Sequence, residues 1–156
     1  MRYKSTSNSR VAAKRMNTPA EITPVSAADY MTLANFRSAL RKFLRTSEEI
    51  ALNLGLTPQQ HQALLAIKGF PGGAPPTISQ LAARLHVRHN SAVGLINRLQ
   101  HHRLVKRQDS QTDHRRVHVV LTVRGSAMLD KLTHSHRIEL RRVGSEITRL
   151  LVELTR

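Results

Sequence analysis

After residue 28 the apolar residues of this chain recur at three- and four-residue steps, the spacing that places side chains on one face of an α-helix. The first such stretch runs from Asp29 to about Leu54, and Asp29 is suited to cap its first turn. Gly55 follows and supplies a C-terminal stop. We therefore predict a long first helix over 29–54, whose apolar face is made by Tyr30, Leu33, Phe36, Leu40, Phe43 and Leu44.

Two further helices begin at residues that suit helix N-termini. Thr57 and Gln60 have the spacing of a capping box, with a proline at the first helical position between them. This second helix ends before the PGGAPP segment at 71–76, which predicts a stiff, exposed loop. Thr77 and Gln80 repeat the capping-box spacing, so a third helix starts there.

A fourth helix is predicted to run to about His102 after a turn near Arg88, and its two faces differ in chemistry. The positions expected to face the core are Ala92, Val93, Ile96 and Leu99. The opposite face contains no acid, whereas a merely solvated helix face, the alternative interpretation, ordinarily carries both signs of charge. In the major groove Asn can pair with adenine and Arg with guanine. We therefore predict a DNA-binding surface of Arg88, His89, Asn90, Ser91, Gly94, Asn97 and Arg98.

A β-hairpin is predicted next, because Leu104 and Val105 begin one strand and residues 117–121 alternate with period two along the other, with the turn-rich segment 108–113 between them. Arginines at the tip of such a hairpin suit a narrow minor groove, where the negative potential is enhanced. Asp113, two residues from Arg115, is expected to orient the arginines by charge-assisted hydrogen bonds. The predicted wing residues are Arg107, Asp113, Arg115 and Arg116.

The last helical stretch follows Thr122, which is suited to cap it, and covers about 123–155. A candidate break lies near Val143-Gly144. Apolar residues at alternating three- and four-residue steps form a seam typical of helix pairing. This seam can pack on the 29–54 helix or on a second copy of the chain, and the two alternatives are not exclusive. We assign to dimerisation Leu33, Phe36, Leu140, Val143, Ile147, Leu150 and Leu154.

Charge and composition narrow the choice of partner. The 156 residues contain 25 Lys and Arg against 10 Asp and Glu, a formal net charge of +15. Such a chain attracts polyanions, among which nucleic acid is favoured over a membrane surface. Residues 1–28 are basic and poor in apolar side chains, which predicts a flexible arm that either touches DNA phosphates or has no specific role.

Features that the sequence lacks disfavour several classes of protein. It contains no Cys, which excludes disulfides, thiolate metal sites and thiol-based switches. No apolar run approaches the roughly 20 residues that cross a bilayer, and the N-terminus lacks the apolar part of a secretory signal, so a cytoplasmic protein is expected. No catalytic triad order, paired carboxylates or phosphate-binding glycine motif indicates an enzyme or a cofactor.

In their order and spacing these segments resemble the MarR family of multiple-antibiotic-resistance regulators from about Asp29 to the end. The resemblance rests on LTPQQ at 56–60, ISQLAARL at 78–85, SAVGLINRL at 91–99, and DHRR at 113–116 eight residues before LTVRG at 121–125. The last two are similar to the family's Asp-x-Arg wing motif and its Leu-Thr-x-x-Gly. The resemblance implies a mainly α fold with a small β-hairpin wing. A winged helix-turn-helix at about 57–122 would lie within a domain at 29–156, between dimerisation helices at 29–54 and 123–155.

The same resemblance implies how the protein binds DNA and how it is regulated. The helix matching 90–102 enters the major groove, and the arginine matching Arg115 reaches the minor groove. A homodimer implies a near-palindromic operator with half-sites roughly 10 bp apart. Many relatives release DNA when a small aromatic molecule binds between the dimer helices and the DNA-binding lobe, so a repressor with such an effector is expected. No local motif marks the residues of an effector pocket, and none are assigned.

Two alternatives remain. A basic architectural or RNA-binding protein without sequence choice would show only salt-dependent affinity, whereas a regulator should prefer its operator by about 10³-fold. A metal sensor is disfavoured because adjacent helical histidines point about 100° apart and few acids lie near the other histidines. The histidine clusters in question are His101 and His102 with His114 and His118, and His134 with His136.

Overall fold

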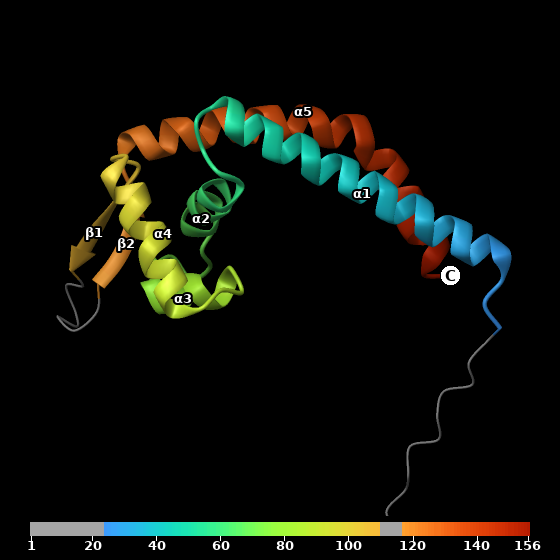
Figure 1. The fold of residues 1–156 in the computed structure, drawn as a ribbon, viewed down its shortest axis with the longest axis horizontal. Helices are drawn as coiled ribbons and strands as arrows, with labels where there is room; N and C mark the ends of the chain where they lie inside the picture. Colours follow the sequence, from blue (N-terminus) through green and yellow to red (C-terminus); the bar gives the residue numbers. More distant parts are fainter. Residues whose placement is uncertain (1–23, 110–116) are drawn as a thin grey trace, which may run out of the picture.

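The computed structural model describes residues 24–109 and 117–156, which form five helices and a two-stranded antiparallel sheet (Figure 1). Most of the predicted N-terminal arm and the tip of the predicted hairpin lie outside these residues. The described chain is mainly helical with a small hairpin, which confirms the predicted fold class. Its elements are α1 (Ala27–Asn53), α2 (Pro58–Lys68), α3 (Ile78–Arg84), α4 (His89–His101), β1 (Val105–Asp109), β2 (Val117–Leu121) and α5 (Val123–Leu154).

Capping boxes determine where the first three helices begin. α2 and α3 start at the predicted capping residues. α1 instead begins at Ala27, with Ser26 as its N-cap. Asp29, expected to be the cap, is the third helical residue, and its carboxylate accepts a hydrogen bond of 2.8 Å from the Ser26 N–H. The predicted start is two residues late because Asp29 is the acid of the capping box and not its N-cap.

α1 and α5 lie side by side as an arm, and α2, α3, α4 and the hairpin form a lobe at one end of it (Figure 1). α5 is continuous, so the predicted candidate break near Val143-Gly144 is wrong. A glycine inside a helix costs about 1 kcal/mol relative to alanine. The burial of Val143 and Leu150 within the arm offsets this cost.

The core of the lobe is aliphatic and draws on all of its elements and on α5. Its fully buried side chains include Leu64, Leu81, Ile96, Leu99, Leu104, Val119 and Leu132. α4 packs on α2 and α3, and in this orientation Leu95 is buried whereas Val93, predicted to face the core, is half-buried. The two positions flank the same apolar stripe, so only the packing partner decides which one is covered.

The hairpin is joined to α5 through the residues of the Leu-Thr-x-x-Gly motif. Thr122 Oγ1 accepts from the Gly125 N–H at 3.0 Å and donates to the Arg103 carbonyl at 2.7 Å. A Cβ at position 125 would overlap the carbonyl oxygen of Leu104. Glycine therefore lets α5 begin directly against the chain that enters β1, which fixes the base of the wing on the arm.

Candidate nucleic-acid interface

α4 presents one face to the core and the opposite face to solvent. Its buried residues are Ala92, Leu95, Ile96 and Leu99. At about 100° per residue, Asn90, Asn97 and His101 lie on the opposite side, and all three are exposed. Among the predicted contact residues only Gly94 is half-buried, whereas the exposed ones are Arg88, His89, Asn90, Ser91, Asn97 and Arg98.

A polar recess of about 520 Å³ adjoins this face, between α4 and the start of α2. Gln59 and Gln62 line it from α2, and Asn90, Gly94 and Arg98 line it from α4. Amide and guanidinium groups can all donate hydrogen bonds to oxygen acceptors. The recess therefore extends the surface that α4 offers to a polar ligand such as nucleic acid.

Arg107 of β1 is hydrogen-bonded to α4. Its Nη2 donates to Oδ1 of Asn97 at 2.8 Å, and its Nη1 donates to Oε1 of Gln100 at 3.1 Å. The structure thus brings a predicted wing residue and a predicted recognition-helix residue into contact. Gln100 was missed by the sequence analysis, because its role depends on how β1 passes α4 and no local pattern marks it.

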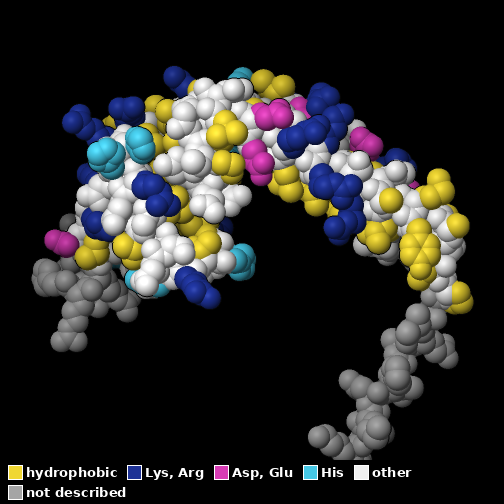
Figure 2. Space-filling view, in the orientation of Figure 1, with side chains coloured by type: hydrophobic (Ala, Val, Ile, Leu, Met, Phe, Trp, Pro, Cys, Tyr) yellow, Lys and Arg dark blue, Asp and Glu magenta, His cyan; other side chains and the backbone are white. Residues whose placement is uncertain are grey.

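The lobe is basic from the start of α2 to the last residue before Asp109 in β1. Between Glu49 and Asp109 the sequence has seven Lys and Arg and no acid. Figure 2 shows Lys, Arg and His side chains over the lobe, whereas most of the visible Asp and Glu lie along the arm. A surface in which basic side chains strongly outnumber acids attracts the phosphate backbone of nucleic acid.

The base of the wing, formed by β1 and β2, is held beside α4. β1 and β2 pair along their whole length, and a bridge between Thr77 and His118 ties β2 to the start of α3. The wing base is thereby fixed to the helix-turn-helix. The remaining predicted wing residues, Asp113, Arg115 and Arg116, lie outside the described residues, as does His114.

A second cavity, of about 350 Å³, lies between α1, α2 and α5, where the arm meets the lobe. Apolar side chains supply much of its wall, among them Phe43, Leu44, Leu65 and Leu140. Concave, mainly apolar sites with a few polar groups are typical of small-molecule binding. Because its residues come from three helices, the cavity had no sequence signal.

His61 of α2 and His136 of α5 stack in this cavity, with ring centroids 4.6 Å apart and planes inclined by 25°. Nδ1 of His136 lies 2.6 Å from the Leu132 carbonyl oxygen and therefore carries a proton. Its Nε2 lies 2.6 Å from Ser47 Oγ, whose hydroxyl donates to it when the ring is neutral. Burial, and then the proximity of His136, lowers the pKa of His61 from its ordinary value of 6.5. At neutral pH the cavity therefore contains an uncharged His61.

The residues assigned to dimerisation fall into two groups. Val143 and Leu150 are buried within the arm of the single chain, whereas Leu33 and Leu140 are each 45% exposed. The half-buried ones are Phe36, Ile147 and Leu154. Part of the seam therefore packs inside the chain and part of it stays uncovered.

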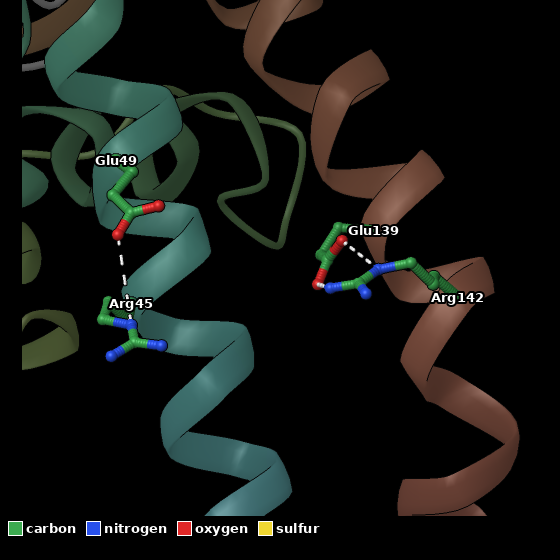
Figure 3. A network of polar contacts seen from close by, with 4 residues as sticks. All are labelled: Arg45, Glu49, Glu139 and Arg142. Atoms are coloured by element: carbon green, nitrogen blue, oxygen red, sulfur yellow. Dashed lines mark hydrogen bonds and ion pairs between the residues drawn. The ribbon is translucent and has the colours of Figure 1, made fainter.

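Ion pairs in the arm connect residues of the same helix (Figure 3). Arg142 donates to both oxygens of the buried Glu139 carboxylate, at 2.7 and 2.9 Å. These hydrogen bonds lower the pKa of Glu139. On α1, Arg45 lies 4.0 Å from Glu49. Since both partners of each pair share a helix, the pairs support the individual helices of the arm.

The other sequence expectations concern metals and membranes. Within residues 24–109 and 117–156, no three His, Asp or Glu side chains lie close enough together to hold a metal ion. His101 and His102 meet edge to face, with centroids 5.7 Å apart. No helix in the described part of the chain is long and apolar enough to cross a membrane.

Comparison with known proteins finds a matching family model and similar solved structures. Residues 54–116 match the sequence model of the MarR family. Similar solved structures include MarR from Escherichia coli in its apo form, at 22% identity and a TM-score of 0.62 over 85% of this chain and 97% of that one. AbsC, a MarR family transcriptional regulator from Streptomyces coelicolor, has 21% identity and a TM-score of 0.66 over 85% and 90%.

A third similar structure contains DNA. It is a MepR mutant from Staphylococcus aureus bound to an oligodeoxyribonucleotide, with 18% identity and a TM-score of 0.62 over 84% of this chain and 95% of that one. No curated protein sequence matches the chain. At these identities the structural likenesses show the fold.

Proposed function

We propose that this chain, whose residues 54–116 are a MarR-family winged helix-turn-helix region, is a transcription regulator that binds a specific DNA operator as a homodimer. α4 enters the major groove with its outward face, and the wing contacts the adjacent minor groove. The observation that carries the proposal is this face of α4. It presents exposed amides and Arg98 in a lobe without acids between Glu49 and Asp109.

Exposed apolar side chains on the arm support the homodimer. They lie along α1 and α5, and full burial of one large apolar side chain contributes about 1.5–3 kcal/mol. Figure 2 shows such side chains gathered at the end of the arm far from the lobe. A second copy covers them, and two-fold symmetry then implies a near-palindromic operator. These residues include Tyr30, Met31, Leu33, Leu40, Leu140, Leu151 and Val152.

The 350 Å³ cavity supports control by a small molecule. It lies where α1 and α5 meet α2, so an occupant that moves these helices changes how the lobe sits on the arm. In a dimer this shift alters the spacing of the two recognition helices. The apolar wall and the stacked imidazoles suit a compact aromatic molecule with a polar group, whose binding releases DNA from a repressor.

Selection from fragmented genomic DNA, with the full chain at fixed near-physiological salt, tests the function. The expected result is enrichment of one near-palindromic sequence. Arg98→Ala should weaken binding to it while the fold is retained, because Arg98 is exposed. Uniform recovery of fragments, with affinity set by salt alone, would contradict the proposal and favour a basic architectural protein.

A further inference from the structure

We propose that Arg107 turns Asn97 and Gln100 into hydrogen-bond donors toward DNA, so that they select guanine over adenine. This inference rests on the proposed function, because it specifies which base edges α4 reads in an operator. It departs from the expectation that an Asn on this helix pairs with adenine. The observation behind it is the pair of hydrogen bonds from one guanidinium to two amides of α4.

The chemistry of the guanidinium fixes the orientation of both amides. Arginine has five N–H donors and no acceptor, so the atoms that it contacts at 2.8 and 3.1 Å must be the amide oxygens of Asn97 and Gln100. If either amide were turned over, two donors would face each other. Arg107 therefore holds each oxygen toward β1 and leaves the NH2 group for another partner.

Asn97 lies where that NH2 group can be read by DNA. It is exposed, and it lies opposite the buried residues of α4. In residues 24–109 and 117–156 no hydrogen bond uses Nδ2 of Asn97 or Nε2 of Gln100. The exposed Arg98 follows Asn97 directly and also only donates. This part of α4 therefore presents a set of donors.

Base edges in the major groove differ in how they match donors. Guanine presents two acceptors, N7 and O6, whereas cytosine presents only the N4 amino donor. Adenine is bound best by an amide that donates to N7 and accepts from N6, which requires the amide oxygen to face the base. At Asn97 the hydrogen bond from Arg107 holds this oxygen toward β1, so we infer that the NH2 group and not the oxygen is turned to the base. Guanine is thus the best match and adenine loses the paired contact.

Binding-site selection from randomised DNA duplexes tests this inference with the full-length chain at fixed salt. Asn97→Ala identifies the operator position that Asn97 reads, as the position whose base preference disappears. In the wild type that position should be guanine. Arg107→Met removes the clamp while keeping a side chain of similar length, and it should reduce the preference for guanine over adenine there by about fivefold, the scale of one hydrogen bond.

Lys106→Met is the matched control. Lys106 is the exposed neighbour of Arg107 on β1, so its loss changes net charge equally without freeing either amide. In this variant any loss of affinity should be the same for all DNA sequences, and the guanine preference should remain. Circular dichroism and thermal unfolding establish that Arg107→Met is folded. If Arg107→Met does not fold, the base that the wild type selects at the Asn97 position still tests the donor assignment.

The outcomes separate the inference from the proposed function. Adenine at the Asn97 position in the wild type overturns the donor assignment and leaves a sequence-specific regulator. An unchanged guanine preference in folded Arg107→Met overturns the role of Arg107. Recovery of no preferred sequence at all overturns the proposed function, and the inference falls with it.

Discussion

The imidazoles of His61 on α2 and His136 on α5 stack with their centroids 4.6 Å apart, which makes them a direct contact between the lobe and the arm. Burial, and then the proximity of His136, lowers the pKa of His61, so the His61 ring resists protonation in the folded chain. His136 satisfies both ring nitrogens through Leu132 and Ser47. Protonation of His61 would therefore place a positive charge at the contact between the lobe and the arm.

Acidification is expected to destabilise the protein through His61. Its pKa is lower in the folded chain than the ordinary 6.5, so below that pH the unfolded chain binds more protons. The free energy of unfolding therefore decreases as pH falls from 6.5 toward the folded pKa. Urea unfolding between about pH 5 and 8 measures this slope, and His61→Gln should reduce it. His134→Gln, at an exposed position of α5, is the control and should keep the wild-type slope. Identical slopes in wild type and His61→Gln would refute the role of His61.

Two glycines of α5 should respond in opposite ways to substitution by alanine. At Gly125 the new Cβ overlaps the Leu104 carbonyl, so Gly125→Ala should lower the free energy of unfolding by about 1–3 kcal/mol. At Gly144 no atom lies within 4 Å of the new Cβ, so Gly144→Ala should raise it by up to about 1 kcal/mol. Chemical denaturation measures both changes. A Gly125→Ala protein as stable as wild type would contradict the close approach of α5 to the Leu104 backbone, just before β1.

Substitutions at exposed and at buried residues of the arm should have different effects. Leu33 is 45% exposed, so Leu33→Asp should leave the chain folded and weaken self-association. Leu150 is buried within the chain, so Leu150→Asp should also lower the unfolding free energy by burying an unpaired charge. Analytical ultracentrifugation and circular dichroism distinguish these outcomes. A Leu33→Asp dimer as tight as wild type at low micromolar concentration would place the dimer contact elsewhere.

Local signals in the sequence were enough to predict most of the fold. The starts of α2 and α3 depend on a capping residue and a partner three positions later, so a short stretch of sequence contains the whole interaction. The cap of α5 at Thr122 is equally local. For the same reason the error at α1 is small: Asp29 belongs to the capping box but is the third helical residue, and the N-cap is Ser26.

Contacts between distant elements were not predictable from the sequence. The stacking of His61 on His136 requires α2 to meet α5, and the clamp of Arg107 on Asn97 requires β1 to lie along α4. Neither contact leaves a pattern in its own segment. The amide chemistry of Asn97 was therefore assigned from the residue type alone, without the neighbour that determines which of its atoms is available.

Sequence-specific reading of DNA by α4 is tested most directly by the ratio of two affinities. The dissociation constants of the full chain are measured for the selected operator and for a duplex of the same composition with its bases shuffled, at one near-physiological salt concentration. The operator is expected to bind about 10³-fold or more tightly. A ratio near one, with both affinities falling equally as salt rises, would show that charge alone binds DNA and would contradict a regulator that reads sequence through α4.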